Sequence, residues 1–176
     1  LMVKRRDDGE VYMLGVAKLP RINPGTVLHN EFLQDVMPEA ERKAAAELSP
    51  DELWNLEQKY DAFIDQCFGP GKFELGSTMH GLVVLNWQRD DSPLQIRRVD
   101  IRAREDLLGA FMKSVGLFYE PSADDPEPDF SAAAYLEQMD DCAVFEFAGG
   151  VDFDKAAEAC KVFLETGEMS GSEDQR

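Results

Sequence analysis

Four consecutive aliphatic residues, Leu82–Leu85, form the most apolar run in this chain. A run of this length predicts a buried strand within a sheet. Patterns typical of strands and of helices are interleaved along the rest of the sequence, without strict βαβ regularity. The sequence therefore predicts an α/β or α+β fold in which helices flank a mixed sheet. Further strands are expected at Glu10–Val16, Phe73–Leu75, Ile96–Ile101 and Cys142–Phe147.

The clearest helix signal is the segment Ser49–Glu52, which reads Ser-Pro-Asp-Glu. Serine caps a helix, proline suits the first helical position, and a glutamate three residues after the serine completes a capping box. Apolar residues then recur at helical spacing from Leu53 to Cys67, so one helix is expected up to the Gly-Pro-Gly stop at residues 69–71. Other helices are expected at His29–Val36, at Pro38–Leu48, at Leu107–Val115 with Gly116 as its end, and from the cap Asp152 to Gly167.

The length of 176 residues fits one domain with its own hydrophobic core. We expect a single α/β domain over residues 1–167 and a disordered polar tail over residues 168–176. Residues 120–130 contain three prolines and five acids, which predicts an exposed loop.

The formal net charge is −17, and it is unevenly distributed. Residues 1–104 have a net charge of −3, whereas residues 105–176 have a net charge of −14. A field of this sign repels nucleic acid and anionic lipid, so neither is an expected partner. No apolar run reaches membrane-spanning length either. An anionic ligand is expected to meet the first portion of the chain.

The potential metal ligands and nucleophiles are scattered. The three cysteines, Cys67, Cys142 and Cys160, and the two histidines, His29 and His80, show no metal-ligand spacing. We therefore expect no metal site, and we expect reduced thiols in a cytoplasmic protein. No G-x-S-x-G motif is present, and a histidine without a sequence-local partner is usually structural.

The candidate binding segment is the loop Lys18–Thr26, which holds two prolines, one glycine and two cations. Arginine offers a planar fork for phosphate or carboxylate, and the prolines lower the entropy lost on ordering the loop. The alternative is a rigid surface turn in which proline takes the second position. The candidate side chains for binding a phosphate, a nucleotide or a substrate are Lys18, Arg21, Asn23 and Thr26.

A second group of cations lies at Arg97, Arg98, Arg102 and Arg104. These arginines either steer an anionic ligand or pair with the acidic residues of the second portion, and the pairing is the favoured interpretation. The chain has no phosphate-binding Walker A loop, because its one Gly-Lys pair, Gly71-Lys72, is followed by Phe73 and lacks the upstream glycine.

Taken together, five segments resemble a bacterial family of HPr kinase-related proteins of the HPr-kinase-related kinase B type. The segments are Lys18–Thr26 (KLPRINPGT), Leu53–Asp61 (LWNLEQKYD), Phe68–Phe73 (FGPGKF), Leu82–Trp87 (LVVLNW) and Gly149–Phe153 (GGVDF).

The resemblance implies an ATP- and Mg²⁺-dependent kinase with the HPr kinase and PEP-carboxykinase type of fold, and a protein as phosphoacceptor. It covers only the C-terminal portion of such a kinase, so the family's catalytic residues cannot be placed on this chain. Because Glu10–Val16 lacks an obvious earlier strand to pair with, we expect the chain to be a fragment that is inactive alone. The alternative function is a non-catalytic module that binds a partner through the acidic second portion; an oligomer is compatible with either.

Overall fold

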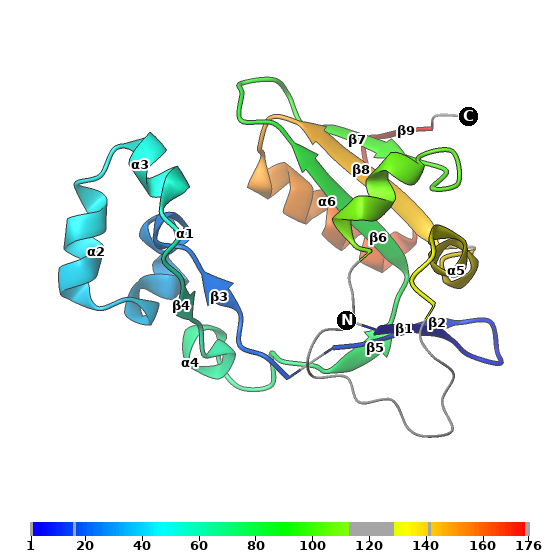
Figure 1. Ribbon diagram of the computed structural model, residues 1–176, viewed down its shortest axis with the longest axis horizontal. Helices are drawn as coiled ribbons and strands as arrows, with labels where there is room; N and C mark the ends of the chain where they lie inside the picture. Colours follow the sequence, from blue (N-terminus) through cyan, green and yellow to red (C-terminus); the bar gives the residue numbers. More distant parts are fainter. Residues whose placement is uncertain (1, 16, 113–128, 141, 175–176) are drawn as a thin grey trace. The chain divides into compact units, whose positions relative to one another are not determined.

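The computed structural model describes residues 2–15, 17–112, 129–140 and 142–174. Helices and strands are mixed along the chain, as the sequence predicts, and the contacts divide it into two compact units (Figure 1). The sheet unit comprises Leu1–Leu14 and Gly76–Arg176, and the inserted unit is Gly15–Leu75. The boundaries between the two units, at Gly15 and at Leu75, fall within the residues 1–167 expected as one domain.

The sheet unit begins with a three-stranded antiparallel sheet in the order β1 (Met2–Arg5), β2 (Val11–Leu14) and β5 (Gly76–Thr78). Gly9, with a φ of +87°, lies in the turn that lets β1 fold back on β2. The expectation that the strand near residue 10 has no earlier partner is therefore wrong. Strand β1 is four residues long and has two cations, which is too short and too polar for a periodic signal.

The larger sheet has four strands in the order β6-β8-β7-β9. Strand β6 is parallel to β8, whereas β7 is antiparallel to β8 and parallel to β9. The most apolar run of the sequence lies in β6, which is an edge strand and leaves Leu85 58% exposed. The strands are β6 (Gly81–Trp87), β7 (Gln95–Arg98), β8 (Ala143–Gly149) and β9 (Ser172–Asp174).

One face of this sheet packs against helix α6 (Phe153–Thr166) (Figure 1). The Asp152 carboxylate accepts a hydrogen bond from the Lys155 N–H at 2.9 Å, and Gly167 ends the helix in the left-handed conformation. Both helix ends are therefore where the sequence predicts them. The core on this face is formed by Leu94, Ile96, Phe145, Phe147, Ala156, Ala159 and Met169.

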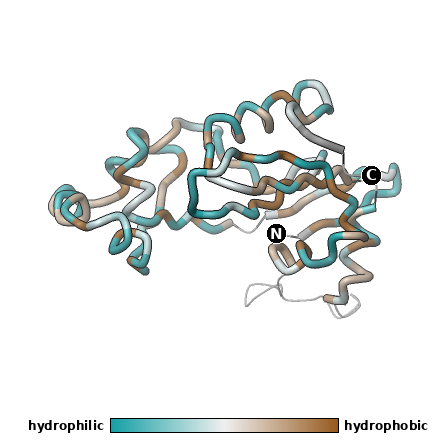
Figure 2. The backbone as a smooth tube through the Cα atoms, turned by 90° about the horizontal axis from the view of Figure 1, so that it is seen from above, coloured by the Kyte–Doolittle hydropathy of each residue, from teal (hydrophilic) through white to brown (hydrophobic). Residues whose placement is uncertain are grey.

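The opposite face packs against the 3-10 helix η2 (Glu105–Ala110) and helix α5 (Ala132–Gln138). The amphipathic helix expected at Leu107–Val115 is a 3-10 helix over its first part, and its last residues, with Gly116, lie outside the described residues. Most of the loop expected at residues 120–130 lies outside them as well. In Figure 2 the hydrophobic colour follows the strands between these two layers.

The last part of the chain differs from the expected disordered tail at residues 168–176. Met169 is buried against the α6 face of the sheet, and β9 adds a parallel strand to β7. A polar composition does not exclude a short edge strand, because the hydrogen bonds between paired strands are made by backbone groups.

The inserted unit is built from short elements around a small core of Val27, Leu33, Met37 and Ala45. The capping box is present: the Ser49 N–H donates to the Glu52 carboxylate at 2.8 Å and the Glu52 N–H donates to Ser49 Oγ. The elements are β3 (Arg21–Ile22), α1 (Pro24–Leu28), the 3-10 helix η1 (Glu31–Val36), α2 (Glu39–Ala46), α3 (Pro50–Asn55), β4 (Tyr60–Asp61) and α4 (Ile64–Phe68).

The single helix expected from Leu53 to Cys67 is wrong. Helix α3 ends at Asn55, and Tyr60–Asp61 instead forms β4, which pairs with β3. Leu53, Tyr60 and Cys67 all pack against the same core, but from three different elements. Their helical spacing is therefore produced by a shared core and not by one continuous helix.

We expect Gly150→Ala to lower the free energy of unfolding by about 1–3 kcal/mol, as overpacking does. A Cβ at Gly150 would collide with the Ser92 carbonyl and lie 2.8 Å from the Asp90 carbonyl, both backbone groups of the β6–β7 loop. Gly109→Ala, where no atom lies within 4 Å of the added Cβ, is the matched control. Equal urea denaturation midpoints for the two variants would contradict this close approach.

Candidate functional site

The predicted binding loop, Lys18–Thr26, lies within the inserted unit and leads through β3 into α1. Its backbone is held against β4, because Arg21 and Ile22 pair with Asp61 and Tyr60 and the Ala62 N–H donates to the Pro20 carbonyl at 2.9 Å. The loop is thus anchored through backbone hydrogen bonds, and its polar side chains remain available.

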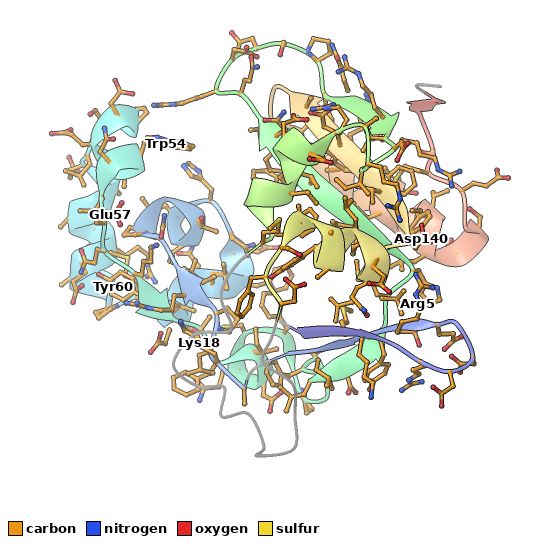
Figure 3. All side chains as sticks on the ribbon, turned by 45° about the vertical axis from the view of Figure 1, so that its right-hand side comes forward. Arg5, Lys18, Trp54, Glu57, Tyr60 and Asp140 are labelled. Carbon is orange, nitrogen blue, oxygen red and sulfur yellow. The ribbon has the colours of Figure 1, made fainter. Side chains whose placement is uncertain are left out.

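The two cations of the loop differ in their surroundings. The Arg21 side chain, 54% exposed, lies across the β3–β4 pair from Asp61, with Nε 3.6 Å from a carboxylate oxygen. Lys18 precedes β3, is exposed (Figure 3), and has no ion-pair partner among the described residues. An exposed pair such as Arg21–Asp61 contributes about 0–1 kcal/mol, so a stronger anion can compete with Asp61 for the guanidinium.

The remaining two candidates shape the start of α1. The Asn23 carbonyl accepts hydrogen bonds from the N–H groups of Thr26 at 3.0 Å and Val27 at 3.2 Å, and the Asn23 side chain makes no capping hydrogen bond. Pro24 is buried at the first helical position. Asn23–Thr26 thus forms the first turn of α1, with proline in the second of its four positions. Asn23 and Thr26 are both exposed, so they lie on the same surface segment as Arg21.

A second polar cluster lies on the η2 face of the larger sheet, around Glu146. This residue is 2% exposed, and its carboxylate accepts hydrogen bonds from Arg104 at 3.0 and 3.1 Å and from the Asn86 amide at 2.8 Å. Arg97 approaches the carboxylate at 4.0 Å. Arg104 also donates two hydrogen bonds of 2.9 Å to Asp106, which is exposed.

The ion pairs and hydrogen bonds of this cluster shift the pKa values of Glu146 and Arg104. Hydrogen bonds from Arg104 lower the pKa of Glu146, with Asn86 and Arg97 acting in the same direction and burial opposing them. Hydrogen bonds to Asp106 and Glu146 raise the pKa of Arg104. The cluster is therefore a charged network at neutral pH that fixes η2 to the sheet.

The arginine group seen in the sequence is mostly paired with acids of the second portion. Arg97 and Arg104 face Glu146, and Arg102 lies 3.1 Å from Asp140. This confirms the pairing interpretation for these three side chains. The sequence signal for Glu146 is present but easily missed, because it is the one charged residue in the apolar segment Ala143–Phe147.

Two cavities open on the sheet unit, and none of the four loop candidates lines either of them. The larger, about 360 Å³, lies along β7 and is lined by Arg97 and Lys155 among others. The smaller, about 200 Å³, includes His80, Asp140 and Cys142. Arg5 donates a hydrogen bond to the Asp140 carbonyl there (Figure 3).

The chemistry of the smaller cavity is limited. Burial raises the pKa of the Cys142 thiol, although the nearby Arg5 opposes the shift, so the reactive thiolate form is disfavoured. In the parts of the chain that the structure describes, no three His, Cys, Asp or Glu side chains are grouped as metal ligands.

Comparisons with protein-family models, with curated proteins and with solved structures returned no match. Among the helices described, none has the length and apolarity needed to cross a bilayer.

Proposed function

We propose that this chain is the C-terminal part of an HPr kinase-related phosphotransferase, and that the Lys18–Thr26 loop binds the phosphates of a nucleotide or the phosphoacceptor group of a protein substrate. The supporting observation is a backbone-anchored loop that presents an exposed arginine and an exposed lysine, the lysine having no ion-pair partner in the described part of the chain. Cations on a rigid support stabilise the negative charge that a transferring phosphoryl group carries.

In this proposal the side chains have separate roles. Arg21 contacts two phosphate oxygens through its planar fork, and Lys18 supplies a point charge on a flexible stem. Asp61 pairs with the Arg21 guanidinium until a stronger anion displaces it. Asn23 and Thr26 offer neutral hydrogen bonds on the same surface.

ATP and Mg²⁺ are the cofactors that the resemblance implies. The loop cations fit a phosphate group. The acidic residues among the described positions form no cluster suited to Mg²⁺, so no metal ligand is assigned in this chain. Following the resemblance, we propose that most of the nucleotide site, and the catalytic residues, lie outside this sequence.

Arg21→Ala is expected to weaken pyrophosphate binding about tenfold, because it removes the bidentate fork. Asp61→Asn is expected to strengthen binding several-fold, since it removes the competing carboxylate. Isothermal titration with sodium pyrophosphate measures both effects. The melting temperature is expected to stay nearly constant in each variant, because the pair is exposed.

The control is Lys43→Ala, which removes an exposed cation of α2 that pairs with Glu39 in the same unit. Pyrophosphate affinity in this variant is expected to match that of the unmodified chain. If Lys43→Ala and Arg21→Ala weaken binding equally, or if pyrophosphate does not bind at millimolar concentration, the loop is only a structural turn.

A second candidate function is a non-catalytic module for a cationic partner. It is favoured by the net charge of −14 in residues 105–176 and by exposed aromatic side chains of the inserted unit, such as Phe32 and Phe68 with ring centroids 6.1 Å apart. Binding to such a partner should weaken steeply with salt. Pull-down at low and at high ionic strength distinguishes this module from a phosphate-binding loop.

A further inference from the structure

The outer edge of strand β6 lacks the features that usually protect a sheet edge. Among the described residues no strand pairs with β6 on the side away from β8. Its sequence, Gly-Leu-Val-Val-Leu-Asn-Trp, contains no charge and no proline. Natural edge strands are commonly kept apart by lysine, proline or a bulge, so an unprotected edge of seven residues is suited to pairing with another strand.

An apolar stripe of helix α6 continues this edge. Phe153, Cys160 and Leu164 are spaced by seven and four residues, which places them on one side of the helix. Phe153 is 69% and Leu164 71% exposed, and Leu85 of β6 is 58% exposed. We call the outer edge of β6 together with Leu85, Phe153 and Leu164 the β6 surface.

Two contacts fix the direction of α6 along β6. The Phe153 ring lies 5.1 Å from the Trp87 ring, edge to face, and a Cβ added to Gly81 would lie 2.9 Å from the Phe163 ring. The start of the helix is therefore beside the end of the strand, and the two run antiparallel. The middle of the strand, Val84, lies level with the middle of the helix, near Glu158.

We infer that the β6 surface binds a second copy of this chain through a two-fold axis at Val84. The two β6 strands then pair antiparallel and join both four-stranded sheets into one. The α6 helices lie side by side, with the stripes of Phe153 and Leu164 in contact across the axis. A two-fold interface of this kind uses the same surface on both copies.

Charge complementarity favours a second copy as the occupant. Asp154 and Lys161 lie on the same outer side of α6, seven residues apart and on opposite sides of the helix midpoint. Neither makes an ion pair within the described part of the chain. The two-fold axis brings Asp154 of one copy opposite Lys161 of the other, and does so twice. The two β6 strands that meet carry no charge of their own.

Sedimentation velocity at 150 mM salt and micromolar protein tests the proposal directly. The unmodified chain is expected to sediment as a dimer. Leu85→Lys introduces a charge into the β6 surface and is expected to raise the dimer dissociation constant about a hundredfold. Leu14→Lys, at a side chain 45% exposed on the other sheet, is the matched control and should leave the constant unchanged.

The expected ion pairs between Asp154 of one copy and Lys161 of the other are tested by reversing the charge of each residue in turn. Asp154→Lys and Lys161→Asp each place like charges opposite one another, so each variant alone should be mainly monomeric. An equimolar mixture of the two variants restores both attractive pairs and should sediment as a heterodimer. Circular dichroism is the check that each variant keeps its helix content.

Several outcomes would overturn this interface. A monomer at 100 μM would do so, as would a dimer that Leu85→Lys leaves intact. A mixture of the two charge variants that stays monomeric would remove the two-fold arrangement. Binding of a strand from a different protein to β6, with the chain itself monomeric, would assign the surface to another partner.

Discussion

Glu146→Ala is expected to lower the free energy of unfolding by about 3–5 kcal/mol, as the loss of one partner from a buried ion pair does. The substitution leaves Arg104 without its buried carboxylate and leaves the Asn86 amide without its acceptor. It also opens space beneath η2, which the hydrogen bonds of Arg104 connect to the sheet. Urea denaturation followed by circular dichroism measures the change.

Asp106→Asn is the control, because it removes the exposed partner of the same arginine. Asp106→Asn should lower the free energy of unfolding by less than about 1 kcal/mol. The two variants differ mainly in the burial of the carboxylate that is removed. Equal losses in both would mean that Glu146 contributes no more than a surface pair.

The pH dependence supplies a second check on Glu146. Its pKa in the folded protein is below the ordinary value of 4.5, so the charged form stabilises the fold above that value. This contribution is lost as the pH falls through the lowered pKa. The stability difference between the unmodified chain and Glu146→Gln should therefore be constant from pH 7 to about 5 and shrink at lower pH. A difference that grows on acidification would contradict the network.

Phe147→Ala is expected to lower the free energy of unfolding by about 3–5 kcal/mol, the usual range for removing a buried phenyl ring. Phe147 is fully buried in the inner strand β8, within the core that α6 covers. Its neighbours across the sheet are Ile96 on β7 and Leu85 on β6. Because the surrounding strands are fixed by their ladders, the cavity cannot close completely.

Phe130→Ala is the matched control for Phe147, since it removes the same side chain from the same unit at a position 43% exposed. Phe130→Ala should lower the free energy of unfolding by less than about 1 kcal/mol. Thermal unfolding of both variants, at a protein concentration low enough to exclude association, compares them. A small loss for Phe147→Ala would place the stabilising core elsewhere.

Local signals predict parts of this fold well. The cap at Asp152, the glycine end at Gly167 and the capping box at Ser49 are set by neighbouring backbone groups, so a short stretch of sequence contains the whole cause. The failures involve distant contacts. The apolar spacing from Leu53 to Cys67 resembles one helix, but the pairing of β4 with β3 interrupts it.

Burial of strands is also decided by distant partners. The most apolar strand, β6, lies at an edge, whereas β8, which carries Glu146, is one of the two inner strands. Hydrophobicity alone cannot rank two strands that occupy different places in one sheet. The place of each strand in the sheet becomes evident only when its pairing partners are known: β8 pairs with β6 on one side and with β7 on the other.

The candidate loop is predictable as a turn but not as an ion pair. Asn23, Pro24 and the short helix α1 follow local turn chemistry. The approach of Asp61 to Arg21 depends on the register of two strands separated by almost forty residues of sequence, which no local pattern specifies.

The inserted unit leaves and re-enters the three-stranded sheet at neighbouring positions. Leu14 of β2 is paired with Gly76 of β5, and the Gly15 N–H donates to the Leu75 carbonyl at 2.6 Å. A short turn joining Leu14 to Gly76 would convert β2 and β5 into a hairpin and preserve their register. We therefore expect that the inserted unit can be lengthened, exchanged or removed between Leu14 and Gly76 while the pairing of β2 with β5 is kept.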